Sequence, residues 1–109
     1  MATTHDMRVK QPYFDMINAG TKDIECRLYD GKRRKICVGD TIVFSNGDKS
    51  FTRRVVGLLI AKDFKKLFSL VDARRAGLDT AENAVAVMQE FYDLDAQHKF
   101  GVVGIVLEK

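Results

Sequence analysis

Two apolar runs separated by Asn46-Gly47 constrain the fold of this chain more than any other sequence feature. Asparagine followed by glycine is a preferred pair for a tight β-hairpin turn, because both residues tolerate the positive φ angles that the turn requires. We therefore predict strands at Thr41–Ser45 and Phe51–Ala61, joined by this turn. Gly57, inside the second run, predicts a bulge or bend in the longer strand.

The segments around this hairpin predict further strands and helices. Period-two alternation or short apolar runs predict strands, and apolar residues at helical spacing predict helices. The expected strands lie at 7–9, 22–28 and 100–109, and the expected helices lie at 12–20, 63–71 and 79–92. Gly20 is expected to end the first helix, Asp63 to cap the second, and Asp79 or Thr80 to cap the third.

The predicted order of elements decides the fold class. A doubly wound parallel sheet would alternate strands and helices, whereas here three strands follow one another and two helices follow those. We predict an α+β fold, a small mixed β-barrel with flanking helices. In the last predicted helix we expect Val85, Met88 and either Phe91 or Tyr92 to form the buried stripe.

Composition places the chain among soluble globular proteins. Its 109 residues suit one domain, expected to span 1–109, and a 46% hydrophobic, 30% charged composition is typical of a folded protein. The longest apolar run, Val55–Ala61, is far shorter than the ~20 residues of a membrane span. Because no apolar leader opens the sequence, we expect a cytoplasmic monomer with Cys26 and Cys37 as reduced thiols. We expect no metal and no cofactor, since there are only two histidines and no Cys-x-x-Cys motif.

The segment "GTKDIECR", Gly20–Arg27, is the most informative polar stretch. Alternation gives it an apolar face, on which Cys26 is a small core residue, and a polar face that carries Glu25 and Arg27. Lys22 and Glu25 are three residues apart, so a straight strand would place them on opposite faces. A site shared by these two side chains therefore requires Lys22 in the turn before the strand, or a bulge.

Each polar residue here has a functional and an ordinary interpretation. Lys22 could pair with phosphate or with Glu25, could act as a base if desolvated, or could be a solvated lysine. Glu25 could accept a hydrogen bond from the amine of a base or activate water, and Arg27 could hold a phosphate or a base edge. These two could equally form a salt bridge with each other. Tyr29 could stack on a base, or it could pack at the end of the strand.

Positive charge is concentrated in the first part of the sequence. Up to residue 75 there are 16 Lys and Arg against 9 Asp and Glu, and from residue 76 there are 2 against 6. Four consecutive cations follow the polar strand: Lys32, Arg33, Arg34 and Lys35. This run is the clearest candidate for a loop that contacts phosphates, and the alternative is a solubilising loop. Five further cations could extend it into one basic side: Arg53, Arg54, Lys62, Lys65 and Lys66.

Gly20, Lys22, Glu25 and Arg27 fit the pattern Gly-x-Lys-x-x-Glu-x-Arg. This pattern resembles the signature of the ASCH domain (activating-signal-cointegrator homology), a small β-barrel of the PUA-like superfamily. The resemblance extends to the upstream helix "QPYFDMINAG", the strand "VGDTIVF" and the closing strand "FGVVGIVLE". It covers nearly the whole chain, from about residue 7 to residue 108.

The resemblance implies a class of partner. ASCH domains look like RNA-binding modules through their kinship with PUA domains, and the signature lines a cleft thought to receive RNA or a nucleoside. The expected ligand is therefore RNA or a modified nucleoside. The residues expected to bind it are Gly20, Lys22, Glu25, Arg27, Tyr29, Lys32, Arg33, Arg34 and Lys35.

The resemblance also implies two enzymatic alternatives. Some small bacterial members are amidohydrolases of acetylated cytidine and use a lysine, a threonine and a glutamate. Lys22 matches the lysine, Glu25 stands at the position of the threonine, and segment 74–79 holds no glutamate to match the third. As an amidohydrolase of 4-acetylcytidine-type nucleosides, the chain would use Lys22 and Glu25 as catalytic residues. A ribonuclease is the second enzymatic alternative. A further possibility, from a different class, is a protein-interaction domain whose cleft has lost its ligand.

Overall fold

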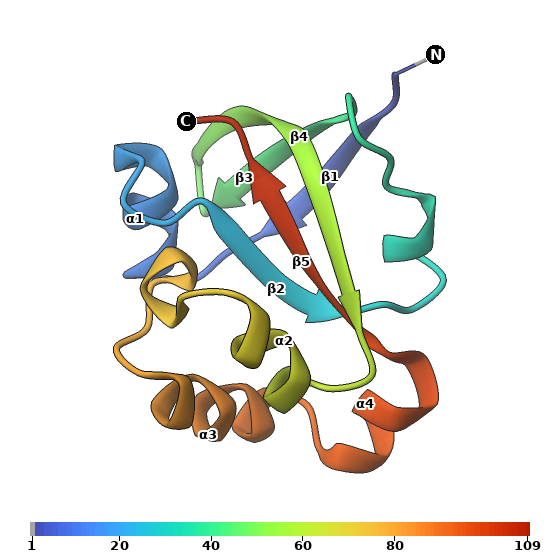
Figure 1. Ribbon diagram of the computed structural model, residues 1–109. Coiled ribbons are helices and arrows are strands. Elements are labelled where there is room, and N and C mark those ends of the chain that lie inside the picture. The colour runs from blue at the N-terminus through green and yellow to red at the C-terminus, as the bar shows by residue number, and fades with distance from the viewer. Residues whose placement is uncertain (1) are drawn as a thin grey trace.

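The computed structural model describes residues 2–109, which form five strands, four α-helices and two short 3-10 turns (Figure 1). The strands are β1 Thr4–Arg8, β2 Ile24–Leu28, β3 Thr41–Asn46, β4 Lys49–Ala61 and β5 Val102–Leu107. The helices are α1 Tyr13–Ala19, α2 Phe64–Leu70, α3 Ala81–Phe91 and α4 Leu94–Phe100, and the 3-10 turns are η1 Arg33–Lys35 and η2 Ala73–Ala76. In this part of the chain no helix combines the length and the apolar character that crossing a membrane requires.

The strands form one curled sheet in the order β1-β3-β4-β5-β2. β1 and β3 are parallel, and the other neighbouring strands are antiparallel. The predicted hairpin is present, but its two-residue turn is Gly47-Asp48, one position later than expected: Asn46 still pairs with Lys49 in the ladder, and Gly47 supplies the positive φ, +62°. The first half of β4 pairs with β3 and the second half with β5, and the register shifts between Val55 and Gly57. This shift confirms the predicted bulge, and it lies where β4 changes partner to curl the sheet.

The apolar core lies on both faces of the sheet. Val103 and Ile105 of β5 pack in one cluster with Phe14 and Ile17 of α1. The adjacent Val102 packs in a second cluster, beneath α2, η2 and α3. Because neighbouring residues of β5 belong to different clusters, this strand is covered on both sides, which explains its nearly continuous apolar sequence.

The first strand is longer than the sequence predicted. It was expected at 7–9, but β1 begins at Thr4 and pairs with β3 from Thr4 opposite Thr41 to Arg8 opposite Ser45. Residues 4–6 have no apolar alternation, so the sequence did not reveal that they pair with β3. A buried Asp40 supports this edge, because its carboxylate lies 2.8 Å from Nε2 of His5.

The C-terminal helices bear out one prediction and add an element that was not expected. Met88 of α3 is buried, and Val85 and Tyr92 pack against the same core cluster, so of the two alternatives Tyr92 belongs to the buried stripe and Phe91, 47% exposed, does not; Ala84 is buried as well. α4 was not predicted at all, because its sequence "LDAQHKF" has no apolar period. The fully buried Gln97 anchors it: its Oε1 accepts from the Phe64 amide at 3.0 Å, and its Nε2 donates to a carbonyl oxygen just after α3.

Candidate ligand-binding site

A cavity of about 320 Å³ lies between the edge of the sheet, α1, η2 and α3. This volume falls in the lower part of the roughly 300–1,000 Å³ range of small-molecule sites. One wall is polar and carries Lys22, Glu25 and Arg27. The other walls are mainly apolar and aromatic, and they carry Tyr13, Leu78, Val87, Met88, Phe91 and Tyr92. The cavity can therefore hold a flat organic ligand that has a polar edge.

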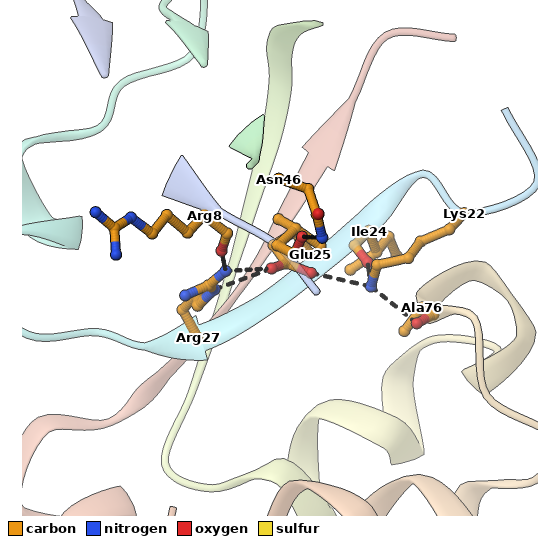
Figure 2. A network of polar contacts seen from close by, with 8 residues as sticks. Arg8, Lys22, Ile24, Glu25, Arg27, Asn46 and Ala76 are labelled. Carbon is orange, nitrogen blue, oxygen red and sulfur yellow. Dashed lines mark hydrogen bonds and ion pairs between the residues drawn. The ribbon is translucent and has the colours of Figure 1, made fainter. Parts of the chain in front are cut away.

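Lys22 stands in the turn between α1 and β2, where a site shared with Glu25 required it to be. Its backbone amide donates to the Met16 carbonyl at 3.1 Å, and its side chain is 4% exposed. The ammonium donates to the carbonyl oxygens of Ile24 at 2.7 Å and Ala76 at 2.8 Å, and it lies 3.1 Å from Oε1 of Glu25 (Figure 2). Three acceptors thus match the three N–H donors of the ammonium.

Glu25 lies at the centre of the polar wall, between the two cations (Figure 2). Its Oε2 accepts from Nε of Arg27 at 2.9 Å and lies 2.8 Å from Nη2 of the same side chain. Burial acts to raise the pKa of Glu25, but the charges and hydrogen bonds of Lys22 and Arg27 outweigh it and hold that pKa below its usual value. The carboxylate is therefore ionised at neutral pH and held in a fixed orientation.

Arg27 connects the cavity to the open edge of the sheet. β2 and β1 are the two outer strands, and Nη2 of Arg27 donates across the gap to the Arg8 carbonyl oxygen at 2.7 Å (Figure 2). Burial acts to lower the pKa of Arg27, but Glu25 and, to a smaller extent, Tyr92 raise it. Among residues 2–109, Nη1 of this guanidinium donates no hydrogen bond of ordinary geometry, and the interaction of Arg27 with the Tyr92 hydroxyl is a weak one, so Nη1 can donate to a ligand beside Tyr92.

Two aromatic side chains approach cations at the cavity. The Tyr13 ring centre lies 5.5 Å from Nζ of Lys22, and the Phe91 ring centre lies 4.1 Å from Nζ of Lys10. The second contact joins the segment after β1 to the end of α3 at the border of the cavity. Aromatic rings at the wall of a cavity are suited to stacking on a flat, conjugated ligand.

Only part of the predicted set of site residues lines this cavity. Lys22, Glu25 and Arg27 do so together, whereas Gly20 ends α1 with a φ of +83° and is not a lining residue. Tyr29 is half-buried against the core, and Cζ of Arg34 lies 4.4 Å from its ring centre. Neither Tyr29 nor any residue of the run 32–35 belongs to the cavity wall.

Part of the cationic run 32–35 makes specific contacts, which a loop that only solubilises the protein would not need. Its last three residues form η1, and Nη1 of Arg33 lies 3.0 Å from Oδ2 of Asp30. Arg34 donates to the Phe100 carbonyl oxygen at 3.0 Å. Of the further cations expected on one basic side, Arg54 is paired with Glu108 at 3.0 Å.

The sequence did not single out several residues that the cavity uses. Arg8, Lys10 and Leu78 lie outside the polar strand, and Phe91 was considered only as a core residue. One pattern could have revealed part of this wall: Val87 and Phe91 are four residues apart on a helix face that the core does not need. In residues 2–109 no three His, Cys, Asp or Glu side chains gather as a metal site would require.

Comparison with known proteins gives matches over almost the full length of the chain. The crystal structure of the hypothetical protein PH0355 is 36% identical, with a TM-score of 0.87, and the match covers 96% of this chain and 97% of that one. The solution NMR structure of protein PF0455 from Pyrococcus furiosus is 31% identical, with a TM-score of 0.77 and 96% coverage of both chains. No curated protein matches the chain.

Two further observations give the fold and the family. The crystal structure of ASCH from Zymomonas mobilis has a TM-score of 0.63 over 95% of this chain and 66% of that one, and at 15% identity it shows the fold alone. The α+β fold predicted from the sequence, a PUA-like barrel with flanking helices, is thereby confirmed. Residues 7–109 match the family described as the ASCH domain, so this chain belongs to the ASCH domain family.

Proposed function

We propose that the cavity binds the base of a nucleoside, either free and modified or as one residue of an RNA strand. The observation that carries this proposal is the ion cluster of Lys22, Glu25 and Arg27 on the wall of a small cavity with aromatic sides. A base offers hydrogen-bond donors and acceptors along one edge and flat apolar faces. The cavity offers matching groups in the same arrangement, with a polar wall and aromatic sides.

The ion cluster is prepared for binding before any ligand arrives. Lys22 holds one carboxylate oxygen of Glu25, and Arg27 holds the other, so neither Glu25 nor Arg27 needs to reorient. The carboxylate can accept a further hydrogen bond from an exocyclic amine, and Nη1 of Arg27 can donate to a carbonyl oxygen or ring nitrogen. Binding to a preorganised edge avoids much of the entropy cost of ordering side chains.

The same contacts favour binding over hydrolysis. A lysine that acts as a base needs a lone pair on nitrogen, and the three N–H groups of Lys22 already have three acceptors. Glu25 is stabilised as the anion by two cations, which weakens it as an acceptor of a proton from water. We therefore assign both residues to orientation of the ligand in the proposed function.

An NMR titration of the isotope-labelled protein tests this proposal. Cytidine, uridine, adenosine, guanosine and 4-acetylcytidine would each be added while amide shifts are followed. We expect saturable shifts at Lys22, Arg27 and Met88 with at least one nucleoside. Arg27→Lys keeps the positive charge but removes the planar fork and its Nη1 donor, so affinity should fall about 10- to 150-fold, corresponding to roughly 1.5–3 kcal/mol for one hydrogen bond from a charged group.

Arg54→Lys is the matched control. Arg54 is also an arginine paired with a glutamate, but it lies outside the cavity, so affinity should not change. The absence of saturable shifts with all five nucleosides, or equal loss in both variants, would refute the proposal. Incubation with 4-acetylcytidine and with RNA separates the enzymatic alternatives. Release of cytidine and acetate, or shortening of the RNA, would assign hydrolysis to this cavity in place of binding.

A further inference from the structure

The two edges of β2 differ in what their backbone groups contact. Just before the strand, the Asp23 carbonyl oxygen accepts from the Leu107 amide at 2.8 Å, and just after it the Tyr29 amide donates to the Gly101 carbonyl oxygen at 2.9 Å. In an antiparallel ladder, hydrogen-bonded and non-hydrogen-bonded pairs alternate. Residues 23, 25, 27 and 29 therefore turn their N–H and C=O groups toward β5, and residues 24, 26 and 28 turn theirs away from it.

The outward edge of β2 faces the gap to β1, the other outer strand of the sheet. The Ile24 carbonyl oxygen agrees with this direction, because it accepts from Nζ of Lys22 at 2.7 Å (Figure 2). Of the three outward residues of β2, Cys26 is the one that lines the cavity. It is 6% exposed, and among residues 2–109 neither its N–H nor its carbonyl oxygen has a hydrogen-bond partner on this edge.

The unpaired backbone groups of Cys26 define what would satisfy them. Buried N–H and C=O groups are almost always paired, because an unpaired one costs about as much as a lost hydrogen bond. The two groups of one extended residue point the same way, so Cys26 offers a donor and an acceptor side by side. A matching ligand carries an acceptor next to a donor on one flat edge. Each RNA base has such a pair on its Watson–Crick edge: N1 and the 6-amine in adenine, N3 and the 4-amine in cytosine, O6 and N1–H in guanine, and O4 and N3–H in uracil.

We propose that the main chain of Cys26 reads the Watson–Crick edge of the base in the cavity, so that the site accepts only a base whose edge is neither paired nor blocked. This inference rests on the proposed function and narrows its ligand class. Met88 and Tyr92 pack in the same cluster as Cys26 and also line the cavity, so they cover one face of the base. Glu25 and Arg27, the neighbours of Cys26 in the strand, reach the third group of the edge. The backbone contact therefore selects for a free edge, and these two side chains select among bases.

Nucleosides with an altered Watson–Crick edge test this inference. Uridine and guanosine would be compared with 3-methyluridine and 1-methylguanosine, which lose the ring donor. Cytidine and adenosine would be compared with 3-deazacytidine and 1-deazaadenosine, which lose the ring acceptor, and all four analogues are uncharged. For each nucleoside that binds, affinity should fall at least about tenfold, because one group of Cys26 is left without a partner. The 2′-O-methyl nucleosides are the matched controls, since they are altered away from that edge and should bind as tightly as their parents.

The NMR chemical shifts of Cys26 give an independent measurement. On saturation with a nucleoside that binds, its amide proton and its carbonyl carbon should both move downfield as their hydrogen bonds form. Leu28 is the internal control. Its N–H and C=O groups point to the same edge of β2, but it lies outside the cavity, so its shifts should not change.

Three results would overturn the reading by Cys26: equal affinity for parents and edge-altered analogues, equal losses with the 2′-O-methyl controls, or unchanged shifts of Cys26 at saturation. In each case the proposed function would still stand if Arg27→Lys weakened binding and Arg54→Lys did not. The absence of binding by every nucleoside would overturn the proposed function and this inference together.

Discussion

Replacing Glu25 by glutamine should destabilise this protein more than any other single exchange of a carboxylate for an amide. The substitution keeps the shape of the side chain and removes the anion that lies between the buried Lys22 and the partly buried Arg27. Lys22 retains its two carbonyl acceptors, and Arg27 retains the Arg8 carbonyl oxygen, but neither cation has a counter-charge afterwards. The charge that remains is as buried as before and no longer balanced.

The expected cost follows from these contacts. Three charge-assisted contacts, at 3.1, 2.9 and 2.8 Å, end on the Glu25 carboxylate. Their gross energy is largely offset by the cost of burying the groups, so it cannot be added up directly. Removal of one member of a buried ion pair costs about 3–5 kcal/mol, because the remaining charge stays buried. A domain of this size has a free energy of unfolding of about 5–15 kcal/mol, so the loss is a large fraction of the total.

Urea unfolding at pH 7, followed by circular dichroism, measures this cost. Glu108→Gln is the control, because Glu108 is also paired with an arginine, at 3.0 Å, but both side chains are at least half exposed. That exchange should cost less than about 1 kcal/mol. A double-mutant cycle with Lys22→Met should show that this second substitution costs less once Glu25 is glutamine. If Glu25→Gln unfolds within about 1 kcal/mol of the native protein, the account of a balanced buried cluster is wrong.

Three other predictions concern buried groups. Gln97→Leu should lower the free energy of unfolding by about 2–5 kcal/mol, because it leaves the Phe64 amide and the Tyr92 carbonyl oxygen without partners. Urea titration measures this loss, and an unchanged urea midpoint would contradict it. Hydrogen bonds from His5, and after it from two backbone amides, lower the pKa of Asp40 from 3.8 to about 2. The contribution of Asp40 to the free energy of unfolding should therefore be complete above about pH 4 and decline toward pH 2, and Asp40→Asn should lose less stability over that interval. Burial raises the pKa of Cys26 to about 12, so a thiol reagent at pH 8 should modify only the exposed Cys37 in the folded protein and both thiols in urea. Reaction of both thiols without urea would show that Cys26 is not buried.

The features that local chemistry controls could be predicted from the sequence. Asn46-Gly47 predicts a hairpin between two apolar runs, and the structure has that hairpin, although Gly47 and Asp48 form the turn and Asn46 ends β3. Gly20, Asp63 and Thr80 end or cap their helices as expected, since each acts on backbone groups within a few residues. α4 escaped prediction because the residue that holds it, Gln97, bonds to groups on other elements.

The same distinction applies to the cavity. Lys22, Glu25 and Arg27 were grouped in advance because a turn and one strand bring them together within six residues. The third partner of the Lys22 ammonium is the Ala76 carbonyl oxygen, 54 residues along the chain, and any residue type could have supplied it. The sequence also could not show that Arg34 contacts the Tyr29 ring and the Phe100 carbonyl oxygen. Nor could it show that Lys32 and Lys35 have no ion-pair partner among residues 2–109.

The ion cluster explains why the polar wall of the cavity and the closure of the sheet occupy the same place. A curled sheet whose outer strands do not pair leaves backbone groups at both edges that need partners. Arg27 supplies one by donating to the Arg8 carbonyl oxygen across the gap, and Glu25 balances the charge of its guanidinium there. Lys22 in turn balances Glu25 and joins β2 to η2 through the Ala76 carbonyl oxygen. A substitution that widens the cavity by removing one of these side chains therefore also opens the edge of the sheet. If the cavity binds a nucleoside as proposed, substitutions at Val87 and Phe91 of α3 should therefore change ligand specificity at the least structural cost, because neither residue belongs to the ion cluster.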